Sequence, residues 1–187
     1  MKRIVVLLLF LTITGLLSAC ATLSKNECLQ ADWFEIGRRD GAAGKPRAVF
    51  QEHIEACLEH GVKANREAYY AGRDEGLRFY CSEDNGFNLG RRGVRYRHVC
   101  PANLESDFLV GYNRGLEIHA YEKKVAALED RLRNIESQIM ANENKLYSDQ
   151  LTSAQRAKIR ADLKYLDIEY RDVVRELNAL EKSKPTS

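Results

Sequence analysis

A seven-residue repeat of apolar residues runs through the C-terminal part of the chain and predicts two long helices. One series recurs every seven residues, with three further apolar residues between its members: Ile118, Val125, Leu132, Ile139 and Leu146, with Tyr121, Leu128 and Ile135. A second series alternates steps of four and three: Ile159, Leu163, Leu166, Tyr170, Val173, Leu177 and Leu180. Both series have the a/d pattern of a coiled-coil seam, in which each helix buries one apolar stripe against a partner helix.

The lengths of the two series indicate how the helices pair. Residues 118–146 and 153–181 are equally long and are joined by the stretch YSDQLT, in which Thr152 forms a capping box with Gln155. Two equal helices joined by a short turn form an antiparallel hairpin, about 43 Å long at 1.5 Å per residue. The sequence therefore predicts a helical hairpin at the C-terminus.

Charged residues surround the predicted seam. Glu129 and Arg133, and likewise Asp167 and Arg171, are spaced by four residues and can pair on the outer face of a helix. Such a charge pattern is typical of a solvated helix face. The alternative is that this face docks a partner helix and completes a larger bundle.

The first twenty residues are typical of a bacterial lipoprotein signal. Two basic residues precede an apolar stretch over 4–17, and the sequence LSAC that ends at Cys20 resembles a lipobox. The apolar run reaches only about 17 residues, whereas a membrane span needs about 20, so a transmembrane anchor is disfavoured. We therefore predict a signal peptide over 1–19, cleavage before Cys20 and covalent acyl chains, palmitate among them, on the thiol of Cys20.

The residue after the lipidated cysteine and the net charge bear on location and partners. Ala21 in place of an aspartate favours the outer membrane, by resemblance to sorting in enteric bacteria, with the protein facing the periplasm. Removal of residues 1–19 deletes two basic and no acidic residues, so the remaining chain has no formal net charge. Because nucleic-acid-binding domains carry a basic face, nucleic acid is not an expected partner.

The four remaining cysteines are interpreted through the predicted compartment. Cys28, Cys57, Cys81 and Cys100 form an even set, and the periplasm is oxidising. Four cysteines allow three pairings, and we expect the sequential one, Cys28 with Cys57 and Cys81 with Cys100. Each bond would stabilise a small helical core by about 3 kcal/mol.

These features give a mainly α fold class: a small disulfide-stapled helical domain followed by a long antiparallel coiled-coil helical hairpin. The boundary is expected near Pro101, with Asn103 as the N-cap of the first long helix. The predicted segments are the signal peptide (1–19), a lipidated N-terminus and tether (20–27), a cysteine- and glycine-rich α domain (28–104), the helical hairpin (105–182) and a tail (183–187).

An aromatic-x-x-Gly pattern recurs in the first domain, as FEIG (34–37), YYAG (69–72), FNLG (87–90) and FLVG (108–111). Three copies continue as Gly-x-x-x-Gly: Gly37 and Gly41, Gly72 and Gly76, Gly111 and Gly115. The copies are too irregularly spaced for a stacked solenoid. Charges between the glycines also argue against a membrane-dimerisation motif. Because glycine destabilises a helix by about 1 kcal/mol, we predict that these glycines admit a neighbouring backbone; a ligand groove is the alternative.

The segments DWFEIGRRDGAAG, AYYAGRDEGLRFYC, NGFNLGRRGVRY and VCPANLESDFLVGYNRG together resemble the bacterial lipoprotein family catalogued as domain of unknown function 2799. The resemblance covers roughly residues 28–120 and leaves out the hairpin. It implies an exported envelope lipoprotein domain with disulfides, and it transfers no catalytic residue to this chain.

Two sets of residues are candidates for binding. His53, Cys57 and His60 lie on one face of a predicted helix and form a weak metal candidate, although an oxidised Cys57 with two flanking histidines is the favoured interpretation. An arginine-rich segment could bind phosphate or carboxylate groups, or could simply be a solvated loop or short strand: Arg91, Arg92, Arg95 and Arg97.

No catalytic motif is present: the chain has no G-x-S-x-G, no H-E-x-x-H, no P-loop and no dinucleotide fingerprint. We therefore expect a non-enzymatic envelope protein with no cofactor beyond the lipid on Cys20. Its expected partners are the membrane, through that lipid, and another envelope protein or polymer. A binding module for an anionic polymer or small ligand is the first alternative, and a peptidoglycan hydrolase is the second.

Overall fold

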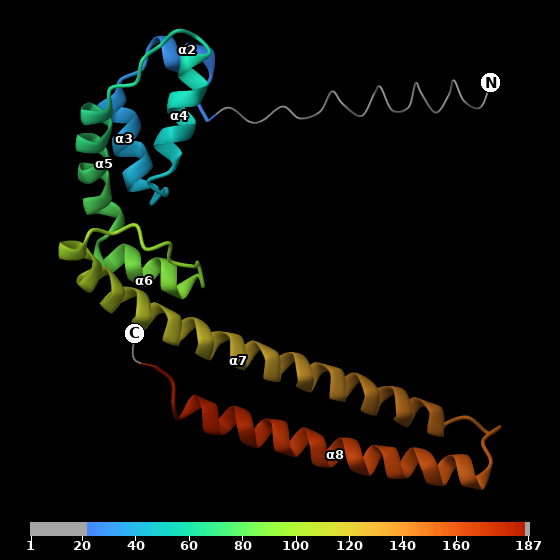
Figure 1. Cartoon of the computed structure of the whole chain (residues 1–187). Helices are drawn as coiled ribbons and strands as arrows, with labels where there is room; N and C mark the ends of the chain where they lie inside the picture. The colour runs from blue at the N-terminus through green and yellow to red at the C-terminus, as the bar shows by residue number, and fades with distance from the viewer. Residues whose placement is uncertain (1–21, 186–187) are drawn as a thin grey trace, which may run out of the picture. The chain divides into compact units, whose positions relative to one another are not determined.

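The computed structural model describes residues 22–185, so the predicted signal peptide and Cys20 lie outside the described part of the chain. All regular secondary structure within 22–185 is helical (Figure 1). The helices are α2 (Lys25–Leu29), α3 (Trp33–Ala42), α4 (Val49–Leu58), α5 (Arg66–Tyr80), α6 (Glu83–Arg91), α7 (Ala102–Leu146) and α8 (Ser153–Glu181). None of the described helices combines the length and the apolar character that a membrane crossing requires.

The described chain divides into two compact units. The first comprises residues 22–85 and 96–108, and the second comprises residues 86–95 and 109–185. Helices α6 and α7 contribute residues to both. Helix α7 begins at Ala102, two residues earlier than a cap at Asn103 allows, because the carbonyl of Pro101 already accepts from the backbone N–H groups of Leu104 and Glu105.

Helices α3 and α5 of the first unit meet through their glycines. A Cβ atom on Gly37 would lie 1.9 Å from the carbonyl oxygen of Tyr69, and one on Gly72 would lie 1.9 Å from that of Phe34. Gly41 and Gly76 face backbone in the same way, one turn further along. Since any side chain would occupy the space of a backbone atom, these positions require glycine.

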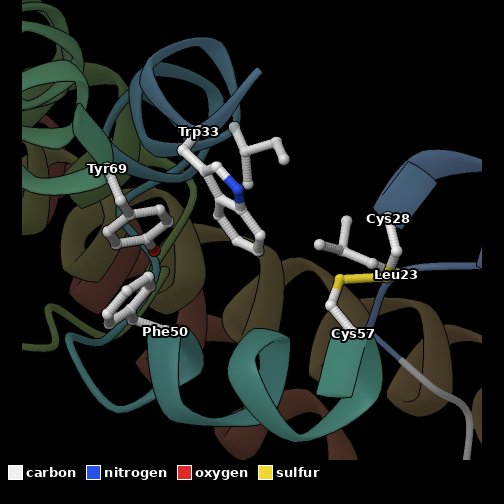
Figure 2. Packing of buried hydrophobic residues seen from close by; sticks show 7 residues of the cluster. Leu23, Cys28, Trp33, Phe50, Cys57 and Tyr69 are labelled. Carbon is white, nitrogen blue, oxygen red and sulfur yellow. A yellow bond between two sulfur atoms is a disulfide. The ribbon is translucent and has the colours of Figure 1, made fainter. Parts of the chain in front are cut away.

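The core of the first unit forms where α2, α3, α4 and α5 converge (Figure 2). The rings of Phe50 and Tyr69 stack with centroids 4.3 Å apart, and Trp33 meets Phe50 edge-on. The disulfide Cys28–Cys57 closes one side of this core, and Cys81–Cys100 is the second disulfide of the same unit. The sequential pairing expected from the sequence is thus confirmed.

The second unit contains a helix pair with the same glycine contacts. A Cβ on Gly90 of α6 would lie 2.1 Å from the carbonyl oxygen of Tyr112, and one on Gly115 of α7 would lie 2.3 Å from that of Phe87. These two contacts reproduce those that Gly41 and Gly76 make in the first unit. The contact in α7 involves Tyr112-x-x-Gly115, an aromatic-x-x-Gly sequence that directly follows the copy at 108–111.

The correspondence extends beyond the glycines. A glycine with positive φ stands two residues after the end of each helix, Gly44 after α3 and Gly93 after α6. The next backbone N–H donates back in the same way, from Lys45 to the carbonyl of Asp40 and from Val94 to that of Leu89. Arg73 donates to the carbonyl of Lys45, and Tyr112 donates to the carbonyl of Val94. The chain therefore builds one type of helix pair twice. The copies looked irregular in sequence because α4 separates the helices of the first pair, whereas a short helix-free link (92–101) separates those of the second.

Helices α7 and α8 form the predicted antiparallel hairpin (Figure 1). The buried centre of the seam consists of Leu128, Ile135, Leu166 and Val173. The capping box of Thr152 and Gln155 is present, and Arg156 donates to the carbonyls of Leu146 and Ser148 across the turn.

Ion pairs on the hairpin agree only in part with the expected ones. Asp167 and Arg171 pair at 2.8 Å, as expected. Arg133 pairs with Asp130, three residues away, rather than with Glu129, so that prediction is wrong. Both spacings place two side chains on one face of a helix, and the rotamer of the arginine decides between them.

Candidate functional site

A buried polar cluster lies inside the first unit, where three helices meet. It consists of Asp40 from α3, His53 from α4 and Tyr69 from α5, and all three are buried. One carboxylate oxygen of Asp40 accepts from the Tyr69 hydroxyl at 2.7 Å and lies 2.8 Å from Nε2 of His53. The glycines of α3 and α5 allow the close approach that brings Asp40 and Tyr69 together.

Two further residues extend this cluster toward the surface. The ammonium of Lys45 lies 2.8 Å from the other carboxylate oxygen of Asp40. On the far side of the imidazole, Nδ1 of His53 lies 2.8 Å from the hydroxyl oxygen of Thr22. We call these five residues the Asp40 cluster. It connects the first described residue of the chain to the middle of the unit.

The protonation of the cluster follows from its contacts. Burial alone would raise the pKa of Asp40, but the hydrogen bonds from His53, Lys45 and Tyr69 outweigh burial and hold this pKa at about 2. Burial and the adjacent carboxylate of Asp40 raise the pKa of Tyr69. At neutral pH the cluster therefore contains a carboxylate and a phenol that donates to it.

A cavity of about 300 Å³ opens beside the Asp40 cluster and is lined in part by Thr22, Arg39, Lys45 and His53. Thr22, His53 and Asp40 form a series of hydroxyl, imidazole and carboxylate like the catalytic triad of a serine hydrolase. The two imidazole nitrogens have the opposite partners, however. In the triad the hydroxyl contacts Nε2, whereas here Asp40 contacts Nε2 and Thr22 contacts Nδ1. The imidazole of His53 is only 1% exposed. The contact between Thr22 and His53 fastens the N-terminal segment to the first unit.

The second helix pair indicates that a pair of this type can form without such a polar cluster. Leu89 of α6 makes the backbone contact that Asp40 makes in α3, and Tyr112 of α7 takes the place of Arg73. Burying a carboxylate costs several kcal/mol that only good partners offset, whereas leucine carries no such cost. The polar residues are therefore specific to the first unit, which makes their positions candidates for a functional role.

The low pKa of Asp40 predicts a pH dependence of stability. A carboxyl whose folded-state pKa lies below its ordinary value contributes stability that is present above about pH 4 and lost as the pH falls toward 2. We expect a loss of about 2 kcal/mol in the unfolding free energy from this group over that window. Urea titrations at neutral and acidic pH measure the loss, and in Asp40→Asn it should be smaller by this amount. An equal acid sensitivity in that variant would contradict the assignment.

The weak metal candidate is not assembled. The sulfur of Cys57 is bonded to Cys28, His53 is engaged inside the Asp40 cluster, and His60 is exposed beyond the end of α4. Within residues 22–185, no group of three or more His, Cys, Asp or Glu side chains is placed to hold a metal ion.

The four arginines of the candidate anion-binding segment are divided between the two units. Arg91, Arg92 and Arg95 belong to the second unit, and Arg97 belongs to the first. Arg91 pairs with Glu122 at 3.1 Å, and Nε of Arg92 donates to the carbonyl of Asn88. Residues 92–101 contain no strand, so the short strand considered for this segment does not form. A carboxylate already engages the first of the four guanidiniums.

Sequence reasoning missed the Asp40 cluster because its members come from four separate segments. The available hint was Asp40 itself, an acidic residue beside Gly41 on a helix face that the glycines were expected to bury. Nothing in the sequence shows that His53 and Tyr69 meet that face, since this depends on how α4 packs against α3 and α5.

Of the comparisons with known proteins, the one with protein families gives a match. Residues 32–117 match the family described as "Protein of unknown function (DUF2799)". No curated protein and no solved structure matches the chain. The matched segment begins at Asp32, the N-cap of α3, and ends two residues after Gly115. It thus spans both glycine-based helix pairs and leaves out α2, α8 and most of α7.

Proposed function

We propose a role from this chain's own features, because the family whose model residues 32–117 match is one of unknown function. The protein is a non-enzymatic lipoprotein of the bacterial outer membrane, cleaved after residue 19 and acylated at Cys20. The mature chain faces the periplasm and acts as an interaction module. The hairpin α7–α8 contacts another envelope protein.

One observation carries this proposal: the hairpin exposes large apolar side chains although its own seam is already filled. Leu128, Ile135 and the facing residues of α8 occupy the seam. Met140 is nevertheless 63% exposed, and Tyr165 and Ile168 of α8 are exposed as well. Such side chains supply the kind of apolar anchors that a partner helix buries when it docks on a helical surface.

Site-specific photocrosslinking in cells tests this proposal on the full chain. A photoreactive phenylalanine analogue replaces Met140, and the matched control carries it at Phe79 of the first unit, which is 65% exposed. We expect a discrete protein adduct from position 140 and none of the same mass from position 79. Adducts from position 79 only, or none from the hairpin, would contradict the assignment of the contact to α7–α8.

A further inference from the structure

Thr22 and Leu23, which follow the proposed site of acylation by two and three residues, contact the first unit. Leu23 is 6% exposed and packs into the core of the first unit, and Thr22 before it is bound to His53. Ser24 then caps α2 through a reciprocal capping box with Glu27. The segment 22–27, expected from the sequence to be part of a tether, is therefore folded.

These contacts leave little free chain between the lipid and the first unit. Two residues separate Cys20 from Leu23, and an extended chain spans at most about 3.6 Å per residue. The residue that carries the acyl chains therefore lies within about 11 Å of a buried core residue. The inference rests on the proposed acylation of Cys20 and adds to it the orientation of the first unit.

Two exposed leucines lie at this end of the unit. Leu29 is the last residue of α2 and Leu58 the last of α4, and they are 58% and 57% exposed. Each directly follows one cysteine of the disulfide Cys28–Cys57, whose Cα atoms are 5.3 Å apart. Figure 2 shows Leu23 beside this disulfide, so the entering chain and both helix ends meet there.

We propose that this end of the first unit, formed by Leu29, Leu58 and the loop 59–65, lies against the phospholipid headgroups of the membrane that holds Cys20. The short link leaves the leucines within reach of the interface, and exposed leucines that each follow one cysteine of the same disulfide are suited to insertion there.

The charged residues at this end are compatible with a lipid surface. Lys25 and Lys63 are exposed and can extend their ammonium groups to phosphates while their alkyl chains lie along the apolar contact. Glu27 is held by Ser24, and Glu59 is also exposed. The apolar contact rather than a net positive charge therefore determines the orientation.

Fluorescence quenching by labelled lipids tests the orientation on the mature, lipidated protein. The protein is reconstituted into vesicles of phosphatidylethanolamine and phosphatidylglycerol that contain a phospholipid with a nitroxide on its headgroup. A fluorescent amino acid replaces Leu29, Leu58 or, as the matched control, Phe79 near the far end of α5. We expect quenching at 29 and 58 to be several-fold stronger than at 79, with helix content unchanged in all three proteins.

The mass of the N-terminal peptide shows whether a negative result comes from a wrong orientation or from the absence of the lipid on Cys20. If Cys20 is acylated and the three positions are quenched equally, the orientation is wrong and the lipoprotein assignment stands. If position 58 captures a protein rather than lipid in a photocrosslinking experiment, a protein covers this end and the orientation is again wrong. If Cys20 carries no lipid, both proposals fail.

Discussion

Gly72→Leu is expected to abolish folding of the first unit. A Cβ atom at this position would lie 1.9 Å from the carbonyl oxygen of Phe34, which is a backbone atom and cannot move aside as a flexible side chain can. The helices α3 and α5 would have to separate, and the core behind them would open. We expect a loss of more than about 4 kcal/mol, which approaches the whole stability of a small unit. Thermal melting followed by circular dichroism measures it.

The matched control for this change is Ala71→Leu, one residue earlier on the same helix. Ala71 is exposed, so the added side chain meets solvent, and we expect a change within about 0.5 kcal/mol. A Gly72→Leu protein that melts like the wild type would show that the two backbones are not in contact. In that case the interpretation of all the helix-pair glycines would be wrong.

Asp40→Asn is expected to produce the second largest loss, about 3–5 kcal/mol. The carboxylate is the common acceptor for His53, Lys45 and Tyr69, and the neutral amide cannot serve all three donors. Buried donors left without an acceptor account for most of the expected cost. Chemical denaturation of the full chain at neutral pH measures the difference.

Asp74→Asn is the control for Asp40→Asn. Asp74 lies on the exposed face of α5, so the same chemical change there should be nearly neutral. A second comparison uses Asp40→Leu, which introduces the residue that α6 has at the matching position. If both Asp40 variants are as stable as the wild type, the cluster does not hold α3, α4 and α5 together.

Much of the fold was predictable because it depends on local or one-dimensional patterns. The heptad spacing specified two helices and their seam, and the capping box at Thr152 specified where the second begins. The even set of cysteines, together with the predicted export from the cytoplasm, led to the prediction of two disulfides. The Gly-x-x-x-Gly spacing specified which helix faces must approach another backbone, since no other feature offsets two glycines one turn apart.

The sequence patterns did not predict which backbone segment each glycine contacts. In the second pair Gly90 meets the carbonyl of Tyr112 and Gly115 meets that of Phe87, and the spacing of the motifs does not name these partners. Helix register is decided by the best fit of two surfaces, and several registers separated by one turn satisfy the same spacing.

The amino-acid sequence by itself determined the helical class, the hairpin, the disulfide-forming residues and the glycine faces, because each depends on the spacing of neighbouring residues. Only the tertiary structure decided that the helix pair occurs twice, that Asp40, His53, Tyr69 and Thr22 meet, and that Leu23 packs into the core. These features depend on contacts between segments far apart in sequence. The physical reason is that a buried polar group is stabilised only by partners at hydrogen-bonding distance, and packing of the helices brings those partners to that distance.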